Sequence, residues 1–252
     1  DVATVGSITL PLSDIQQSTQ LRLDLKTGEY HNYYKLWVYR LLAMNPELVV
    51  ADTLDVPTLK ALQQGKSVLL SPRHASIEKQ SVGGLFTPDY WNYATFKTIS
   101  ENNNKPVSPG TLGMMNPTHP LFDHFPTEGR SDWQWWSIAL NSRPLILNSL
   151  DKDYRPLIQT VDNVERNHKL GILMEFRVGK GKLLISTTDF DAITSCVEGR
   201  AYVDAVRQYM LSADFHPETA ITADALRSLL YSETKVRDIQ GVKNLTDYKE
   251  KK

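Results

Sequence analysis

The sequence lacks the features that indicate a disulfide-bonded protein, a membrane-spanning protein or a strongly charged one. A single cysteine, Cys196, stands among 252 residues, so no internal disulfide can form. That count fits a reducing compartment, and equally a bacterial periplasmic or secreted protein that does without disulfides. No apolar run approaches the roughly 20 residues that a membrane span needs. Lysine plus arginine (28) nearly balance aspartate plus glutamate (29), so no strong field would attract nucleic acid or an anionic membrane.

Motifs that expose a catalytic nucleophile are also missing. Neither G-x-S-x-G nor G-x-C-x-G occurs, although these patterns place a serine or cysteine on a sharp strand-to-helix turn. Cys196 lies in "DAITSCVEGR" without a histidine close in sequence, and we interpret it as a structural thiol. Ser71 and His74 in "SPRHAS" could form a proton relay, but no third member is visible. We interpret them as part of a solvated loop.

Metal ligands and paired acids receive little support from spacing. His119 and His124 are five residues apart, but Pro120 and Pro126 interrupt any helix that would present both to one ion. Glycoside hydrolysis needs two carboxyl groups close in space, and sequence spacing does not show that any two converge here. The acids that are candidates by position are Glu128, Asp132, Glu175, Asp189 and Asp191. We therefore predict no metal site, no cofactor and no catalytic residue.

Residues 1–43 carry the clearest local pattern. "QLRLDL" places leucines on one face and charged residues on the other, which is the period of a half-buried strand. "KTGE" around Gly28 predicts a turn, and "YYKLWVY" predicts a second strand. A hairpin of this kind is marginally stable alone. It could simply pack on the rest of the chain, but we favour the terminal strands of a β-sandwich that lies mostly upstream.

From about Met44 the pattern changes, and we predict an α/β domain over residues 44–232. Short apolar runs in "LVVAD" and "SVLLSP" flank the helical "VPTLKALQQGK", which predicts a βαβ unit. "LGILMEFRV" and "KLLISTT" flank "GKG" and predict a tight hairpin. "GRAYVDAVRQYML" and "TADALRSLLY" predict helices, the second with Thr222 as N-cap. The expected fold is three-layer α/β with a mainly parallel central sheet, followed by a polar tail at residues 233–252.

Aromatic residues gather in two places where they could contact a ligand. Residues 76–117 are irregular, and loops of this length are usually functional or ordered by a partner. Tyr90 and Trp91 lie in its "PDYWNY" part and are candidate ligand contacts.

The second place is "HPLFDHFPTEGRSDWQWW", residues 119–136, which holds three of the five tryptophans. Trp133 is a candidate contact for a sugar ring, whereas at least one of Trp135 and Trp136 is expected to be buried. We interpret the stretch as a connector that anchors one edge of the α/β domain.

Four stretches carry a resemblance to a known family: "SITLPLSDI", "LKALQQGKSVLLSP", "NKPVSPGTLGMMNPTHPLFDHFPTEGRSDWQWW" and "QTVDNVERNHKLGILMEFRVGKGKLLIST". They resemble the C-terminal region of bacterial glycoside hydrolases of family two, which carry β-galactosidase or sugar-binding names. The similarity spans residues 4–215. In that family the catalytic barrel and its two glutamates lie upstream, so the resemblance places no catalytic residue on this chain.

The α/β part more faintly resembles the flavodoxin-like or class I glutamine-amidotransferase-like fold. Enzymes with that fold use a triad of cysteine, histidine and glutamate, and the cysteine of the elbow is missing here. The resemblance therefore implies a domain that kept the scaffold and lost the amidotransferase chemistry.

These observations lead to an expected function. We expect a non-catalytic C-terminal accessory module of a multidomain glycoside hydrolase, periplasmic or secreted, whose main partners are upstream domains of the same polypeptide. The chain opens on Asp1 rather than methionine, so we interpret it as a piece of a longer protein. Two alternatives stay open: a carbohydrate-binding module that holds an oligosaccharide with exposed aromatic rings, and a stand-alone amidotransferase-like hydrolase. Neither nucleic acid nor a membrane is an expected partner.

Overall fold

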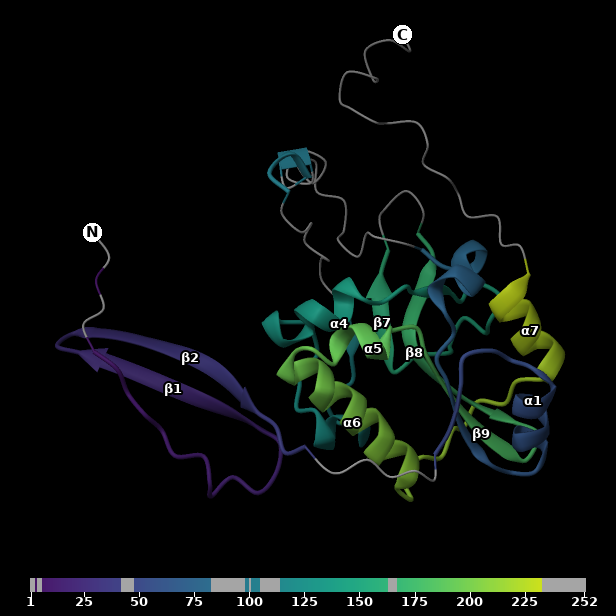
Figure 1. Cartoon of the computed structure of the whole chain (residues 1–252), viewed down its shortest axis with the longest axis horizontal. Helices are drawn as coiled ribbons and strands as arrows, with labels where there is room; N and C mark the ends of the chain where they lie inside the picture. Colours follow the sequence, from purple (N-terminus) through teal and green to yellow (C-terminus); the bar gives the residue numbers. More distant parts are fainter. Residues whose placement is uncertain are drawn as a thin grey trace, which may run out of the picture.

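The computed structural model describes residues 3, 6–41, 48–82, 98–99, 101–104, 114–162 and 167–232. They form a two-stranded hairpin that projects from one side of a larger α/β body (Figure 1). None of the helices within these ranges is long and apolar enough to span a membrane.

The hairpin consists of β1 (Thr19–Thr27) and β2 (Tyr30–Val38), which pair antiparallel from Thr27↔Tyr30 at the turn to Thr19↔Val38 at the base. Gly28 begins the turn with a φ of 56°, a left-handed conformation that glycine adopts without steric cost. The predicted hairpin is confirmed. Among the described residues its two strands form a sheet of their own.

The body is built on a mixed sheet of seven strands. Its order is β3 (Val49–Ala51), β4 (Ser67–Leu70), β9 (Gly181–Ser186), β8 (Lys169–Val178), β7 (Ile158–Val161) and β5 (Met114–Met115), with β6 (Leu145–Ile146) paired to β8. The two parallel pairs are β3 with β4 and β4 with β9. The remaining pairs of this sheet are antiparallel.

Short helices complete the body. They are α1 (Val56–Gln63), η1 (His74–Gln80), α3 (Leu121–His124), η2 (Trp133–Trp135), α4 (Trp136–Leu140), α5 (Phe190–Ile193), α6 (Val197–Leu211) and α7 (Ala223–Tyr231), of which the η elements are 3-10 helices. Asp55 caps α1 by accepting from the Thr58 backbone N–H at 2.8 Å. Thr222 caps α7, as predicted, by accepting from the Ala225 N–H at 3.1 Å.

The predicted fold class is wrong. The sheet is mixed rather than mainly parallel, so the three-layer flavodoxin-like or glutamine-amidotransferase-like assignment fails, and the preceding β segment is a separate hairpin within the described residues. The reason lies in the connections. Only Gly179 and Lys180 join β8 to β9, and residues 162–168 join β7 to β8, whereas a parallel crossover needs about a dozen residues or more. The predicted βαβ unit, β3–α1–β4, is present but fills only one edge.

Both faces of the central strands are covered by apolar side chains. In β4, Leu69 packs in a cluster with residues of α3, α4 and α6, whereas Val68 and Leu70 pack in a second cluster with residues of α1 and α7. A strand that is buried on both faces reads as a continuous apolar run, which is what "SVLL" shows. Figure 1 shows α6 lying across one face of the body, with α1 and α7 together at the far side from the hairpin.

Gly181→Ala tests the close packing of α1 on β9. A Cβ at Gly181 would lie 2.5 Å from the Leu62 carbonyl oxygen and 2.7 Å from its Cα, which are backbone atoms that move only if the helix moves. We expect the free energy of unfolding to fall by about 1–3 kcal/mol in urea denaturation. Gly6→Ala is the control, because nothing lies within 4 Å of its added methyl group. Equal stability of the two variants would contradict this packing.

Candidate functional site

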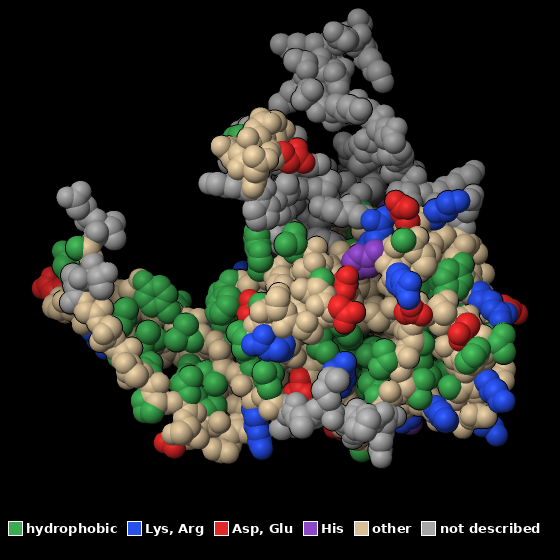
Figure 2. Space-filling view, viewed as in Figure 1, with side chains coloured by type: hydrophobic (Ala, Val, Ile, Leu, Met, Phe, Trp, Pro, Cys, Tyr) green, Lys and Arg blue, Asp and Glu red, His purple; other side chains and the backbone are tan. Residues whose placement is uncertain are grey.

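The hairpin presents two unlike faces, because side chains alternate along each strand. One face, which we call the leucine face, carries Leu21, Leu23, Leu25, Tyr30, Tyr34, Leu36 and Val38, with Thr19, Thr27 and Asn32 among them. The opposite face, the polar face, carries Gln20, Arg22, Asp24, Lys26, His31, Tyr33, Lys35 and Trp37. Of its large apolar residues, Leu25, Tyr30, Tyr34 and Leu36 are exposed, and Leu21, Leu23 and Val38 are half-buried. Figure 2 shows hydrophobic side chains gathered along the hairpin and at its junction with the body.

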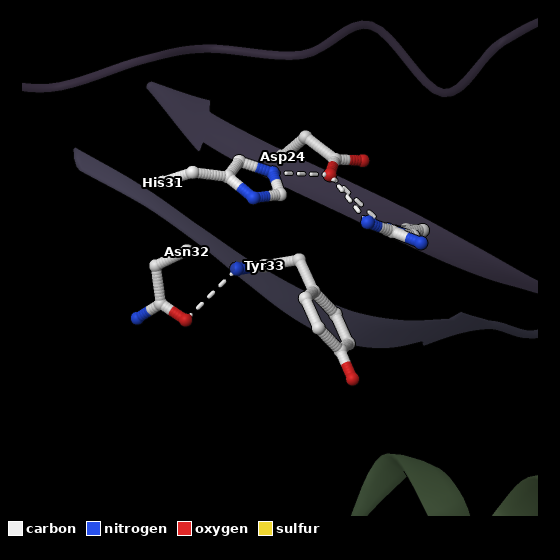
Figure 3. A network of polar contacts seen from close by, with 5 residues as sticks. Asp24, His31, Asn32 and Tyr33 are labelled. Atoms are coloured by element: carbon white, nitrogen blue, oxygen red, sulfur yellow. Dashed lines mark hydrogen bonds and ion pairs between the residues drawn. The ribbon is translucent and has the colours of Figure 1, made fainter. Parts of the chain in front are cut away.

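A network of polar contacts joins several charged side chains of the polar face, which suits that part of the face to water (Figure 3). The Asp24 carboxylate on β1 accepts hydrogen bonds from the Arg22 guanidinium at 2.8 Å and from Nε2 of His31 on β2 at 2.9 Å. The bond from His31, and next the bond from Arg22, holds the pKa of Asp24 below its ordinary value. The Arg22 guanidinium also lies 4.3 Å from the centre of the Tyr33 ring. The network ties β1 to β2 and leaves the leucine face uncovered.

The base of the hairpin is held on the body by aromatic and polar contacts. Tyr39, which follows β2, stacks on Phe125 with ring centres 5.4 Å apart. Its hydroxyl donates to Oε1 of Gln134 at 2.7 Å. Trp37 meets Trp133 edge to face, with ring centres 5.1 Å apart. Segments that are far apart in the sequence therefore meet at one junction.

An ion pair between Lys35 of β2 and Glu128 adds to this junction. On the side of the body the junction is formed by four residues, which we call the seat: Phe125, Glu128, Trp133 and Gln134. The pair is partly exposed, so it contributes orientation more than stability.

The seat is preorganised from inside the body. Gln134 is buried, and its Nε2 donates to the Pro126 carbonyl at 3.1 Å, which turns Oε1 toward Tyr39. Burial raises the pKa of the Tyr39 hydroxyl, which therefore stays protonated and able to donate. Trp135 is buried beneath the seat and donates from Nε1 to the Thr127 hydroxyl at 2.9 Å.

Residues 119–136 thus receive the hairpin, a role that the sequence did not reveal. The burial of Trp135 confirms that at least one of the adjacent tryptophans packs inside. The contact between Tyr39 and Gln134 was missed, because 95 residues separate the two and no spacing rule connects them.

Of the predicted ligand contacts, Tyr90 and Trp91 lie outside the described residues. Trp133 is 56% exposed, and its contact with Trp37 engages only part of the ring. Its role in sugar binding stays a prediction.

Ser71 and His74 lie just beyond β4 and face the backbone that follows β9. The Ser71 hydroxyl donates to the Thr188 carbonyl at 3.4 Å, and Nε2 of His74 donates to the Thr187 carbonyl at 2.8 Å. Because a carbonyl only accepts, His74 carries a proton on Nε2, and that atom is not a base for Ser71. Both side chains fix the loop after β4.

Cys196 and most of the candidate acids have structural roles. The Cys196 sulfur caps α6, the Asp189 carboxylate caps α5, and Asp132 caps η2. Asp191 is exposed at the start of α5. Within the described ranges, no group of three or more His, Cys, Asp or Glu side chains could hold a metal ion.

Glu175 of β8 and Tyr209 of α6 form a hydrogen-bonded pair inside the body. The Tyr209 hydroxyl donates to the Glu175 carboxylate at 2.7 Å. Burial raises the pKa of Glu175, and the hydrogen bond from Tyr209 opposes this shift. The His119 ring packs against Tyr209 with centres 5.1 Å apart, and burial lowers the pKa of His119. His119 is thus a packing residue, and no described metal group includes it or His124.

Tyr39→Phe tests the seat. The variant keeps the ring stacked on Phe125 but leaves Oε1 of buried Gln134 without its donor, so we expect a loss of about 1–2 kcal/mol in the free energy of unfolding. Chemical denaturation measures it. Tyr34→Phe is the control, because its hydroxyl accepts from the Nδ2 of Asn32 at an exposed position. An equal loss in both variants would show that the hydrogen bond between Tyr39 and Gln134 makes no specific contribution to the free energy of unfolding.

Glu175→Gln tests the half-buried acid. Because its folded pKa lies above the ordinary value of 4.5, Glu175 binds its proton more tightly when folded, and its charge costs stability above that raised pKa. We expect the variant to exceed the parent in melting temperature at mildly alkaline pH, with an advantage that shrinks as the pH falls toward 4.5. Asp191→Asn, at an exposed site, should show no such trend. A variant less stable than the parent at alkaline pH would refute the assignment.

Comparison with known families matches the two parts separately. Residues 1–40, which include the hairpin, match the family described as "Domain of unknown function (DUF8488)". Residues 49–231, more than half of the chain, match the family described as "Domain of unknown function (DUF8487)" and span the α/β body. None of the curated proteins matches the chain. By its body, the chain belongs to the DUF8487 family.

Proposed function

We propose that the chain is a non-catalytic accessory module of a larger protein and attaches to a neighbouring β-structured domain through the hairpin. One observation carries the proposal. Among the described residues, none of the buried hydrophobic side chains lies before Leu54, yet nine of the nineteen large exposed hydrophobic ones lie in residues 6–41. This segment therefore exposes to solvent an amount of apolar surface that a folded protein normally buries.

The surface fits a β-sheet better than a helix. The leucine face alternates along two strands of nine residues each, as the inner face of a sandwich does. β1 and β2 pair only with each other in the described chain, so each also has an outer edge of unpaired backbone groups. A partner sheet can cover the face and continue an edge, whereas a helix covers only the face. We therefore assign the occupant as a β-sheet of a neighbouring domain in the same polypeptide.

In this proposal the body has a positioning role rather than a catalytic one. The seat fixes the base of the hairpin on the body. A neighbouring domain that covers the leucine face would therefore also fix the position of the α/β body relative to itself. Cys196, Ser71 and His74, the side chains first considered for nucleophilic catalysis, are occupied with caps and loop contacts. The resemblance to C-terminal regions of glycoside hydrolases supports a larger protein that cleaves O-glycosyl bonds, in the periplasm or outside the cell.

Leu23→Asn tests this docking. In the chain alone Leu23 is half-buried, so we expect a small loss of stability. In the longer protein, where the partner sheet buries it, the loss should be larger by about 1–2 kcal/mol, measured by chemical denaturation of both proteins. Arg22→Asn is the matched control on the polar face and should cost the same in both. An equal cost of Leu23→Asn in the two contexts would rule out a covered leucine face.

A further inference from the structure

An open cavity of about 800 Å³ lies where three parallel strands of the sheet end. Its walls come from β3, the loop into α1, the loop after β4, the start of α5, and one residue of α6. The volume falls in the range of small-molecule sites. The carboxyl ends of parallel strands are also where open α/β sheets place their ligands. This cavity is separate from the seat and from the leucine face.

One wall of the cavity is held rigidly. The Ser71 backbone N–H donates to the Ala51 carbonyl at 2.8 Å, which ties the end of β4 to the end of β3. The side chains of Ser71 and His74 bond to the backbone after β9. Arg73, which also lines the cavity, lies between these two anchored residues, so its backbone is held on both sides.

Charges of both signs line this space. Arg73 pairs with Asp52 at 2.7 Å; the Arg73 side chain is 80% exposed and the Asp52 side chain 48%. The other charged residues of the lining are Asp55, Asp189, Asp191 and Arg207. An anion would therefore meet four carboxylates, and a cation would meet two guanidinium groups.

A hydroxyl group suits this lining, because it donates to a carboxylate and accepts from a guanidinium. The adjacent Asp52 and Arg73 can receive two neighbouring hydroxyls of one molecule. Phe190 lines the same cavity, and its ring is partly buried against the core. It offers an apolar surface for the C–H side of such a molecule.

We propose that this cavity binds a neutral polyhydroxylated molecule of the size of a mono- or disaccharide, held by the Asp52–Arg73 pair and supported by Phe190. The proposal goes beyond docking and does not depend on it, because the cavity lies within the body. Binding here requires no exposed tryptophan, which separates it from a platform at Trp133.

Isothermal titration of the whole chain tests the site. The probes are galactose, lactose and inositol as neutral polyols, glucose 6-phosphate as an anion, and glucosamine as a cation. We expect saturable millimolar binding of at least one neutral polyol. Asp52→Asn and Arg73→Gln should each weaken it by about tenfold or more, because each removes a charged hydrogen-bonding partner.

Asp224 and Arg227 provide the matched control, an exposed ion pair on α7 outside the cavity lining. Asp224→Asn and Arg227→Gln should leave the affinity unchanged, and melting curves should show all four variants folded. Three results would overturn the proposal: no saturable binding of any neutral probe, tighter binding of a charged probe, or loss of binding in Trp133→Ala but not in Arg73→Gln. None of them bears on docking of the leucine face, so the two proposals fail independently.

Discussion

The buried amide of Gln134 is the contact on which the arrangement of the two parts depends. It bonds inward to the Pro126 carbonyl and outward to the Tyr39 hydroxyl, so one side chain joins the interior of the body to the base of the hairpin. A buried amide that lost either partner would be costly, and this makes the contact specific. The hairpin therefore leaves the body in a set direction, with its leucine face uncovered.

Local elements of the fold were predictable, because they depend on neighbouring residues. Alternating leucines with a turn at Gly28 gave the hairpin, "GKG" gave the β8–β9 turn, and Thr222 gave the start of α7. The strand directions were not predictable in the same way. From the βαβ unit at β3–α1–β4 we predicted parallel pairing for most of the sheet. The short link between β8 and β9, however, requires antiparallel pairing there.

The candidate site shows a similar division. The burial of Trp135 follows from the general preference of large aromatic residues for the core. The seat and the cavity each join residues from distant parts of the chain, as Tyr39 with Gln134 and Asp52 with Asp189 show. Sequence spacing carries no information about such encounters. Ser71 and His74 were interpreted as a solvated loop, whereas their side chains brace one wall of the cavity.

The two parts of the chain differ in how complete they are. The body buries two large apolar clusters, one on each face of its sheet, and a third, small one, and side chains cap several of its helices. The hairpin has one face with a hydrogen-bonded polar network and one face whose large apolar side chains are half-buried or exposed in the described chain. Under the proposed docking, the module would gain stability and position from the domain that covers this face.

Amide hydrogen exchange over β1 and β2 tests this account most directly. The chain alone would be compared, under the same conditions, with the longer polypeptide that the proposal requires. A covered leucine face predicts fast exchange at the outward-facing amides of residues 19–38 in the chain alone and marked protection in the longer polypeptide, with α6 equally protected in both. Exchange in the hairpin that is the same in both proteins would contradict the account.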